Sequence, residues 1–205
     1  MNVPHKPFYD AVKRIFDLVF SAVCIIILSP VLLAVTIAVS IDGGAPIYSQ
    51  IRVGKDGKQF RIYKFRSMCK DADKMLEQLK AQNEMDGPAF KMKNDPRITP
   101  VGRFIRRTSL DELPQLFNVF IGNMTVVGPR PPLPKEVDRY NDYQRQRLLV
   151  KQGLTCYWQC SGRSNIGFDE WVELDLKYIR ERGLLTDLKI LFMTVPAVIR
   201  GDGAE

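Results

Sequence analysis

The feature that most constrains this chain is an uncharged, apolar run of 24 residues from Leu18 to Ile41. As a helix it would be about 36 Å long, enough to cross a hydrocarbon core of about 30 Å. Ser29 and Pro30 lie in the middle of the run. Because proline lacks a backbone donor and disfavours helical geometry in the residue before it, the sequence predicts a membrane-inserted helix that is kinked or broken at this point.

Both flanks of the apolar run are basic. Lys13 and Arg14 precede it, where long basic side chains can reach lipid headgroups, and six lysines and arginines follow it between positions 52 and 66. The positive-inside rule would keep both flanks on the cytoplasmic face. A helix that enters, breaks and leaves on one face satisfies both signals, whereas a proline-kinked transmembrane helix is the commoner structure. The residues alone leave both alternatives open.

The composition excludes several classes of protein. The chain has 205 residues, of which 45% are hydrophobic and 26% charged, as in ordinary globular proteins. Its only histidine, His5, lies near the N-terminus, which excludes Ser-His-Asp, HExxH and multi-histidine metal chemistry. Four cysteines without a disulfide pattern favour a reducing compartment. The net charge of +7 favours an anionic partner: a nucleic acid, a phosphorylated metabolite or an anionic membrane surface.

The pattern of residues after position 42 predicts a single globular unit. We expect an α+β, mostly helical fold, with residues 1–42 as the lead-in and membrane helix and residues 43–205 as the domain. The turn signal Asp56-Gly57 predicts a hairpin of strands 48–53 and 59–65. Farther along, the predicted elements are a helix over 134–150, a short strand over 154–161, and amphipathic helices over 168–182 and 184–200, the last interrupted at Pro196.

The strongest local group of polar residues is RRTSLDELPQLFN, from Arg106 to Asn118. It contains two adjacent carboxylates, Asp111 and Glu112, at the start of a predicted helix. Ser109 and Glu112 also fit a capping box, in which the acids merely complement the helix dipole. Alternatively, a carboxylate can attack phosphorus and form an aspartyl phosphate, provided that cations neutralise the charge.

Cations for such chemistry are close at hand in the sequence. Mg²⁺ takes one or two carboxylates plus substrate phosphates and waters, and arginines bind phosphate through paired donors. Lys64 lies in a predicted strand, and Arg130 lies in the rigid GPRP turn. The sequence has neither a GxxxxGK[ST] loop nor a GxGxxG turn, which argues against P-loop and Rossmann nucleotide sites. The arginines available are Arg103, Arg106, Arg107, Arg130 and Arg163.

Several motifs in order resemble the bacterial sugar transferases, the monotopic phosphoglycosyl transferase family. They span nearly everything from Lys13 to Arg200 and read KRIFD, IYKFRSM, DPRITPVGRFIRRTSLDELPQLFNV, VVGPRPP and GLTCYWQCSGR. The family often reads PGxTGxWQVxGR in the last motif, and this chain departs from it at Gln152 and Cys156.

The resemblance implies an enzyme that moves a sugar phosphate from a UDP-sugar to undecaprenyl phosphate. The products would be undecaprenyl diphosphate-sugar and UMP, formed with Mg²⁺ through a covalent aspartyl intermediate in a ping-pong mechanism. This step begins the synthesis of a surface glycan such as O-antigen, capsule or exopolysaccharide. The catalytic domain would lie on the cytoplasmic face of the bacterial inner membrane.

The resemblance also implies roles for individual residues. Asp111 matches the nucleophile and the metal contact, and Glu112 is its paired carboxylate. Ser29 and Pro30 match the break of a re-entrant membrane helix, which favours re-entry over a span, and Lys13 and Arg14 match a headgroup anchor. Four residues match positions that bind phosphates or lie near the active site: Lys64, Arg106, Arg130 and Arg163.

Two further expectations concern substrates and partners. The segment 83–91, NEMDGPAFK, resembles family members that act on plain hexose phosphates, so we expect UDP-glucose or UDP-galactose as the donor. No nucleic acid partner is expected, and a homodimer is one alternative for the oligomeric state. The competing hypothesis is a membrane-anchored basic module that binds anionic lipid or nucleic acid without Mg²⁺ and with an affinity that falls steeply with salt.

Overall fold

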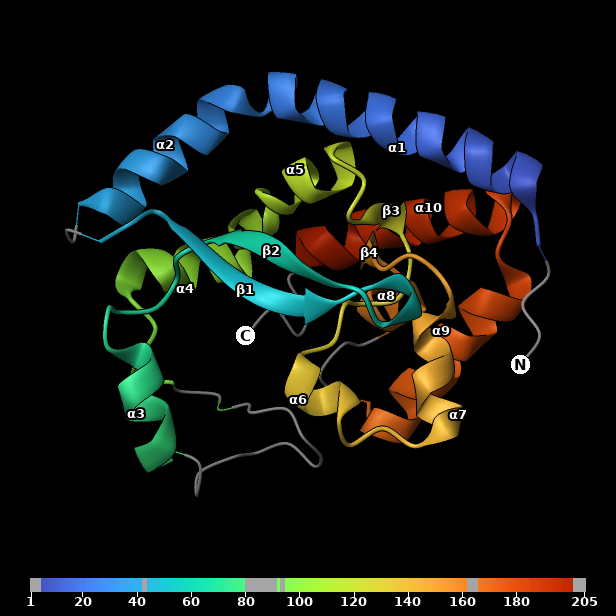
Figure 1. Ribbon diagram of the computed structural model, residues 1–205. Helices are drawn as coiled ribbons and strands as arrows, with labels where there is room; N and C mark the ends of the chain where they lie inside the picture. The colour runs from blue at the N-terminus through green and yellow to red at the C-terminus, as the bar shows by residue number, and fades with distance from the viewer. Residues whose placement is uncertain (1–4, 42–43, 80–91, 93–94, 162–165, 201–205) are drawn as a thin grey trace.

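Two apolar helices form one bent arc along the molecule, α1 (Pro7–Ile27) and α2 (Ser29–Ser40) (Figure 1). The structure is a computed structural model that describes residues 5–41, 44–79, 92, 95–161 and 166–200. The two helices meet at an angle of 63°. Pro30 lies in the first turn of α2, where its missing N–H has no acceptor inside the helix. The predicted break at Ser29–Pro30 is therefore confirmed.

The arc has the composition of a membrane segment only when both helices are taken together. Among the described residues, no single helix is both long and apolar enough to cross a bilayer, whereas the bent pair matches a broken span or a re-entrant loop in length and composition. Its exposed large apolar side chains include Phe8, Ile15, Val19, Ile26, Ile27, Leu33, Ile37 and Ile41. An exposed apolar surface of this extent marks an interaction surface.

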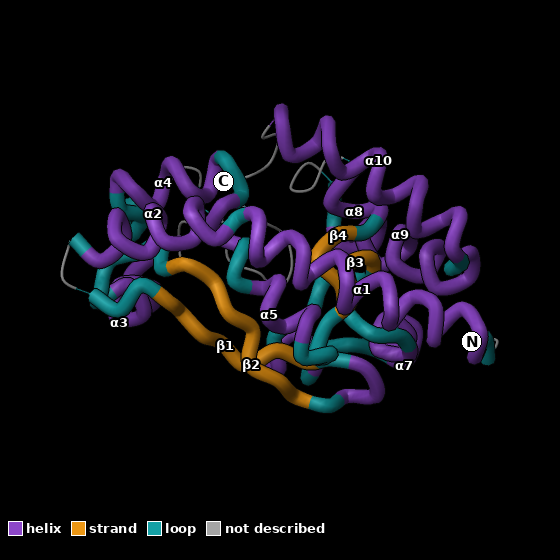
Figure 2. Tube along the Cα trace, turned by 90° about the horizontal axis from the view of Figure 1, so that it is seen from above, coloured by secondary structure: helices purple, strands orange, loops and turns teal. Residues whose placement is uncertain are grey.

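The hairpin predicted from the turn signal is present. Strands β1 (Ile47–Val53) and β2 (Gln59–Phe65) pair antiparallel, with Val53 opposite Gln59. The connecting turn η1 (Lys55–Gly57) has positive φ at Asp56 and Gly57, which these two residue types tolerate best. Seen from above, the hairpin and helix α10 lie on opposite sides of α1 (Figure 2).

The rest of the described chain is mainly helical around a second, very small sheet. Strand β3 (Thr125–Val127) pairs in parallel with β4 (Gly153–Thr155). The other elements are α3 (Ala72–Leu79), α4 (Pro100–Arg107), η3 (Leu110–Glu112), α5 (Gln115–Phe120), α6 (Pro134–Val137), α7 (Asp142–Arg145), η4 (Gln146–Leu149), α8 (Tyr157–Cys160), α9 (Phe168–Glu181) and α10 (Leu184–Arg200). The expected α+β, mostly helical class is confirmed for the described residues.

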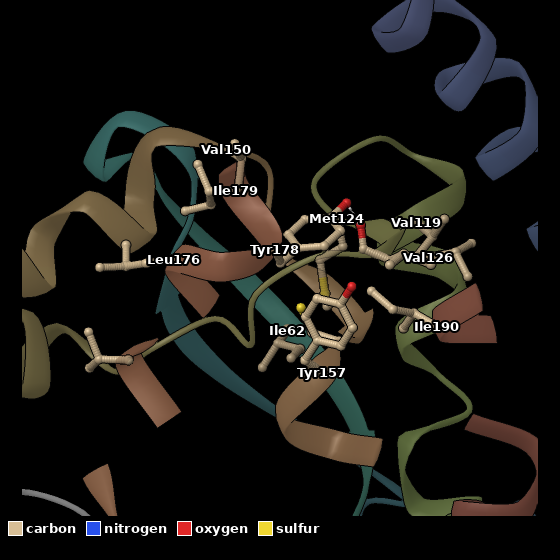
Figure 3. Close-up of a cluster of buried hydrophobic side chains, with 13 residues drawn as sticks. Ile62, Val119, Met124, Val126, Val150, Tyr157, Leu176, Tyr178, Ile179 and Ile190 are labelled. Carbon is tan, nitrogen blue, oxygen red and sulfur yellow. Dashed lines mark hydrogen bonds between the residues drawn. The ribbon is translucent and has the colours of Figure 1, made fainter. Parts of the chain in front are cut away.

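The largest hydrophobic core joins the hairpin to the small sheet and the C-terminal helices. Side chains of β2, β3, α9 and α10 meet in it, as Figure 3 shows for Ile62, Val126, Ile179 and Ile190. Each of these four residues is at most 3% exposed. The core therefore fixes β2, which carries Lys64, and β3, which leads into the turn that carries Arg130.

Three predicted elements differ from the structure. Residues 134–150 do not form one helix, because Asn141 caps a new helix: its side chain accepts a hydrogen bond from the Gln144 N–H. The strand predicted over 154–161 is limited to Gly153–Thr155, and a helical turn, α8, follows it. Helix α10 continues through Pro196, where proline removes a single backbone hydrogen bond.

Polar contacts attach α1 to the rest of the molecule. The Asp17 carboxylate is buried and accepts a hydrogen bond from the Val126 N–H at 2.9 Å. Arg14 donates to the carbonyls of Val119 and Phe120 at the end of α5, both at 2.8 Å. Lys13 pairs with Asp187 of α10 at 2.6 Å. Lys13 and Arg14 thus have protein partners, and their contact with headgroups stays a prediction.

Candidate active site

Asp111 and Glu112 lie in the short 3₁₀ turn η3, between α4 and α5. The preceding residue Ser109 has a φ of 56°, a left-handed conformation that costs free energy in a residue with a side chain. Its side chain makes no capping hydrogen bond. The capping box that Ser109 and Glu112 could have formed is therefore absent, and capping by Ser109 does not explain the carboxylate pair.

Glu112 is held by two cations. Its Oε1 lies 2.6 Å from Lys64 Nζ and 3.4 Å from Arg130 Nη1. Burial alone would raise the pKa of Glu112, but Lys64 and Arg130 together hold that pKa well below its usual range. Burial lowers the pKa of Lys64, and the Glu112 charge opposes that shift. Glu112 is thus fixed as an anion that orients Lys64 and Arg130.

Asp111 is a different kind of carboxylate. It is only 9% exposed, and among the described residues it has no hydrogen-bond or ion-pair partner. Burial raises the pKa of Asp111 to about 6, against the opposing charge of Lys64, and the Glu112 charge adds to the increase. A carboxylate that is desolvated, unpartnered and close to cations is ready to react with or bind an incoming group.

Asn118 of α5 sets the position of β2, and so of Lys64. The Asn118 side chain is fully buried; its Oδ1 accepts from the Tyr63 N–H and its Nδ2 donates to the Arg61 carbonyl. These two bonds connect α5 to the strand residues just before Lys64. The sequence analysis missed this role, because an asparagine late in a predicted helix carries no signal of a contact 55 residues away.

Arg130 is aimed by its turn and by an aromatic stack. Arg52 Nη1 donates to the Pro131 carbonyl at 3.0 Å, which ties the GPRP turn to β1. The Arg130 guanidinium lies 5.8 Å from the Trp158 ring centroid, and Trp158 stacks on Trp171 at 4.4 Å. The YWQC segment therefore contributes to the site through Arg130.

Gln152 and Cys156, the departures from the family pattern, are fully buried. The Gln152 amide donates to the carbonyls of Arg147 and Val150. The turn before β4 is therefore held by hydrogen bonds from this side chain.

The other predicted phosphate-binding residues are placed less centrally. Arg106 donates from Nε to Ser67 Oγ at 2.8 Å; burial lowers its pKa, and the nearby Asp111 charge opposes that shift. Arg97, which was not among the predicted site residues, is buried and paired with Asp95. Arg163 lies outside the described residues, as does the segment 83–91.

The carboxylate pair fits Mg²⁺ as a metal shared with substrate. Among the described residues, no group of three or more His, Cys, Asp or Glu side chains could hold a metal. Mg²⁺ commonly takes one or two carboxylates, with phosphate oxygens and waters completing its shell. Asp111, with no protein partner, and Glu112, which is 32% exposed, meet that requirement.

Comparisons with known proteins identify the family. The model of the bacterial sugar transferases matches residues 8–201. The undecaprenyl-phosphate galactose phosphotransferase of Salmonella typhimurium is 48% identical, and the UDP-galactose-lipid carrier transferase of Erwinia amylovora is 46% identical; each alignment covers 94% of this chain and 41% of the relative. The exopolysaccharide production protein ExoY of Rhizobium meliloti is 38% identical, over 97% of this chain and 90% of its own length.

The chain spans about two-fifths of the length of the first two relatives. The shared part contains Asp111, Glu112 and the cations around them, because the family model covers all of these positions. The chain belongs to the bacterial sugar transferase family.

Proposed function

We propose that this protein transfers a sugar phosphate from a UDP-sugar to undecaprenyl phosphate. The observation that carries the proposal is the unequal pair in η3: Glu112 is neutralised by Lys64 and Arg130, whereas Asp111 is buried and unpartnered. A nucleophile needs a free lone pair, and a diphosphate substrate needs cations, and this site offers both. The names of two relatives support a UDP-sugar donor and a lipid phosphate acceptor.

In the first step, an Asp111 carboxylate oxygen attacks the phosphorus that carries the sugar. The bond from that phosphorus to the bridging oxygen breaks, and UMP leaves with the electron pair. Lys64, Arg106 and Arg130 stabilise the negative charge on the phosphoryl oxygens. The product on the protein is an aspartyl phosphosugar.

In the second step, an oxygen of undecaprenyl phosphate attacks the same phosphorus. The bond to the Asp111 oxygen breaks, which restores the carboxylate and releases undecaprenyl diphosphate-sugar. Mg²⁺, when bound by Asp111 and Glu112, would supply further neutralisation of the phosphate charges. UMP leaves before the acceptor reacts, and the covalent aspartyl phosphosugar links the two steps, so the mechanism is ping-pong.

The acceptor is a lipid, and the arc of α1 and α2 suits re-entry into one leaflet. The bend at Ser29–Pro30 returns the chain toward the same face, and exposed apolar side chains of α10, such as Leu185 and Phe192, can lie at the interface. Both basic flanks then stay on the cytoplasmic face of the inner membrane. This arrangement brings the lipid phosphate and the soluble donor to one site.

A hexose donor, UDP-galactose or UDP-glucose, is the one we propose. Two relatives are named for galactose or UDP-galactose, and another is named for UDP-glucose. We propose the synthesis of a surface polysaccharide as the pathway, as the name of the exopolysaccharide relative suggests.

The test is UMP release by protein purified in nanodiscs, with UDP-galactose or UDP-glucose, Mg²⁺ and undecaprenyl phosphate. Asp111→Asn should abolish turnover while the protein stays folded, and Asp138→Asn, which changes an exposed aspartate, should not alter it. Without lipid, wild type should release about one UMP per protein and gain the mass of a hexose phosphate on Asp111. Turnover by Asp111→Asn at the wild-type rate would refute the nucleophile.

A further inference from the structure

A small cavity shares Lys64 and Arg130 with the site. Its polar lining is completed by Arg52 and Gln115, and Ile62 and Leu154 contribute apolar walls. The space that a water-sized group can occupy is about 10 Å³, which accommodates a single such group. The cavity is thus too small for a whole phosphate and large enough for one of its oxygens.

Two buried donors at this cavity have no acceptor. Gln115 is 3% exposed, yet its Nε2 makes no hydrogen bond with any described residue. The Nε of Arg52 is also buried and likewise unpartnered within the described chain, although its Nη1 and Nη2 bind Pro131 and Gln50. Buried donors are nearly always satisfied in native proteins, so two beside one cavity indicate an absent acceptor.

The charged residues that line the cavity are all positive. Three cations, Arg52, Lys64 and Arg130, line it, and the carboxylate that pairs with two of them is Glu112. Burial and the nearby Arg130 charge together lower the pKa of Arg52 to about 10. This excess of positive charge would be relieved by an anion.

The cavity also lies close to Asp111. Lys64 lines the cavity, and its charge lowers the pKa of Asp111, so the two groups are near enough to interact. Gln115 begins α5, which follows the turn η3 that carries Asp111. An anion that reaches Lys64 in the cavity is therefore near the carboxylate that attacks phosphorus in the proposed reaction.

We infer that this cavity binds one non-bridging oxygen of the donor's diphosphate, with Gln115 Nε2 and Arg52 Nε as its hydrogen-bond donors. The inference rests on the proposed function for the identity of the donor. It adds two residues to the binding site that the motif around Asp111 does not assign. Arg52 has a second task there, because it also holds the carbonyl of Pro131 beside Arg130.

Removal of a side-chain amide changes the stability of the free protein differently when the amide binds a ligand and when it holds the fold together. Gln115→Met keeps the shape of the side chain and removes its donor. Because that donor is unpartnered in the free protein, the variant should be as stable as wild type or more stable. A structural glutamine such as Gln152, whose amide binds two carbonyls, would lose stability on the same change.

The experiment is calorimetric titration of the full chain in nanodiscs with UDP and Mg²⁺, which requires no turnover. Gln115→Met should weaken UDP binding about 10-fold, the range expected for a hydrogen bond to a charged group, without lowering the melting temperature. Gln115→Glu, which adds a negative charge, should weaken it further. Gln146→Met, which changes a partly exposed glutamine outside the cavity, should bind as wild type does.

Further arms separate the sources of phosphate. Pyrophosphate should show the same loss in Gln115→Met as UDP, because the contact is to a phosphate oxygen. A loss seen only with a short polyprenyl phosphate would overturn the assignment to the donor. Unchanged UDP binding in Gln115→Met, a lower melting temperature, or wild type that binds neither UDP nor pyrophosphate would also overturn it. If wild type binds UDP in a way that depends on Gln115 but releases no UMP with any donor, the proposed function is refuted and the inference about the cavity stands.

Discussion

The ion pairs around Arg147 and around Glu112 are built differently. In one, Arg147 and Asp175 are both fully buried; Arg147 Nε donates to Asp175 Oδ2 at 2.8 Å, and the guanidinium lies 4.5 Å from the Trp171 ring centroid. In the other, Lys64 and Arg130 share Glu112, while the neighbouring Asp111 has no partner within the described chain.

The difference lies in how the charges balance. The Arg147 cluster pairs one cation with one anion and closes aromatic rings around them, so it leaves little room for a ligand. The η3 cluster has surplus cations, an acid with no partner among the described residues, and an adjoining cavity. A balanced buried pair indicates structure, whereas an unbalanced one indicates a site that a charged ligand completes.

The largest effect is expected where the balanced pair is broken. Arg147→Met leaves Asp175 buried without its counter-charge, which should lower the free energy of unfolding by about 3–5 kcal/mol. Thermal or denaturant unfolding in detergent measures this. Arg139→Met, at an exposed arginine, is the matched control and should change little. Equal stability of the two variants would show that the Arg147 pair is not structural.

Lys64→Met should have the opposite effect to Arg147→Met: it should impair catalysis and leave stability nearly unchanged. Glu112 keeps Arg130 and is 32% exposed, so the free energy of unfolding should change by less than about 1 kcal/mol. Loss of a cation that stabilises phosphoryl charge should lower kcat for UMP release about 100-fold. If Lys64→Met instead lowered the free energy of unfolding as much as Arg147→Met does and left kcat of the folded protein unchanged, Lys64 would have a structural role like that of Arg147.

The pH dependence sharpens the same contrast. Asp111 must be ionised to attack, and burial raises its pKa to about 6, so UMP release should fall about tenfold per pH unit below that value. The Lys64 charge lowers the pKa of Asp111, so Lys64→Met should move the acid limb to higher pH. Initial rates of wild type and of Lys64→Met from about pH 5 to about pH 8 measure the acid limb of each protein. A limb that stays in place would contradict the coupling of Lys64 to Asp111.

The smallest effect is expected at the aromatic support of Arg130. Trp158→Leu removes a cation–π contact worth about 0.5–1 kcal/mol, so kcat/KM for the donor should fall about twofold to fivefold. Trp158→Phe keeps an aromatic face and should recover part of the loss. Steady-state kinetics on the two variants test this, and equal values for both would argue against a role of the ring.

Local signals predicted the hairpin and the helix break. Asp56-Gly57 permits positive φ at two successive positions, and Pro30 acts on its immediate neighbours, so both outcomes depend on a few adjacent residues. The helix expected over 134–150 was wrong because the amide of Asn141 competes with the helix for the backbone. The spacing of apolar residues carries no information about such a side-chain hydrogen bond.

The site was predictable only where its residues share a motif. Asp111 and Glu112 are adjacent, so one short stretch of sequence indicated both. Gln115 lies in the same stretch, but Arg52 lies in β1, and only the packing of the folded chain shows that the two residues line one cavity.

The bond between Asp17 and the Val126 N–H has a further consequence. Val126 lies four residues before Arg130, and the stretch between them is β3 and the rigid GPRP turn. The Asp17 hydrogen bond therefore connects the first helix to Arg130 through a short stretch of chain. If α1 lies in the bilayer as proposed, its depth of immersion sets the height of Arg130 above the lipid phosphates. A thicker or thinner bilayer would then alter access for the lipid acceptor while leaving affinity for the soluble donor unchanged.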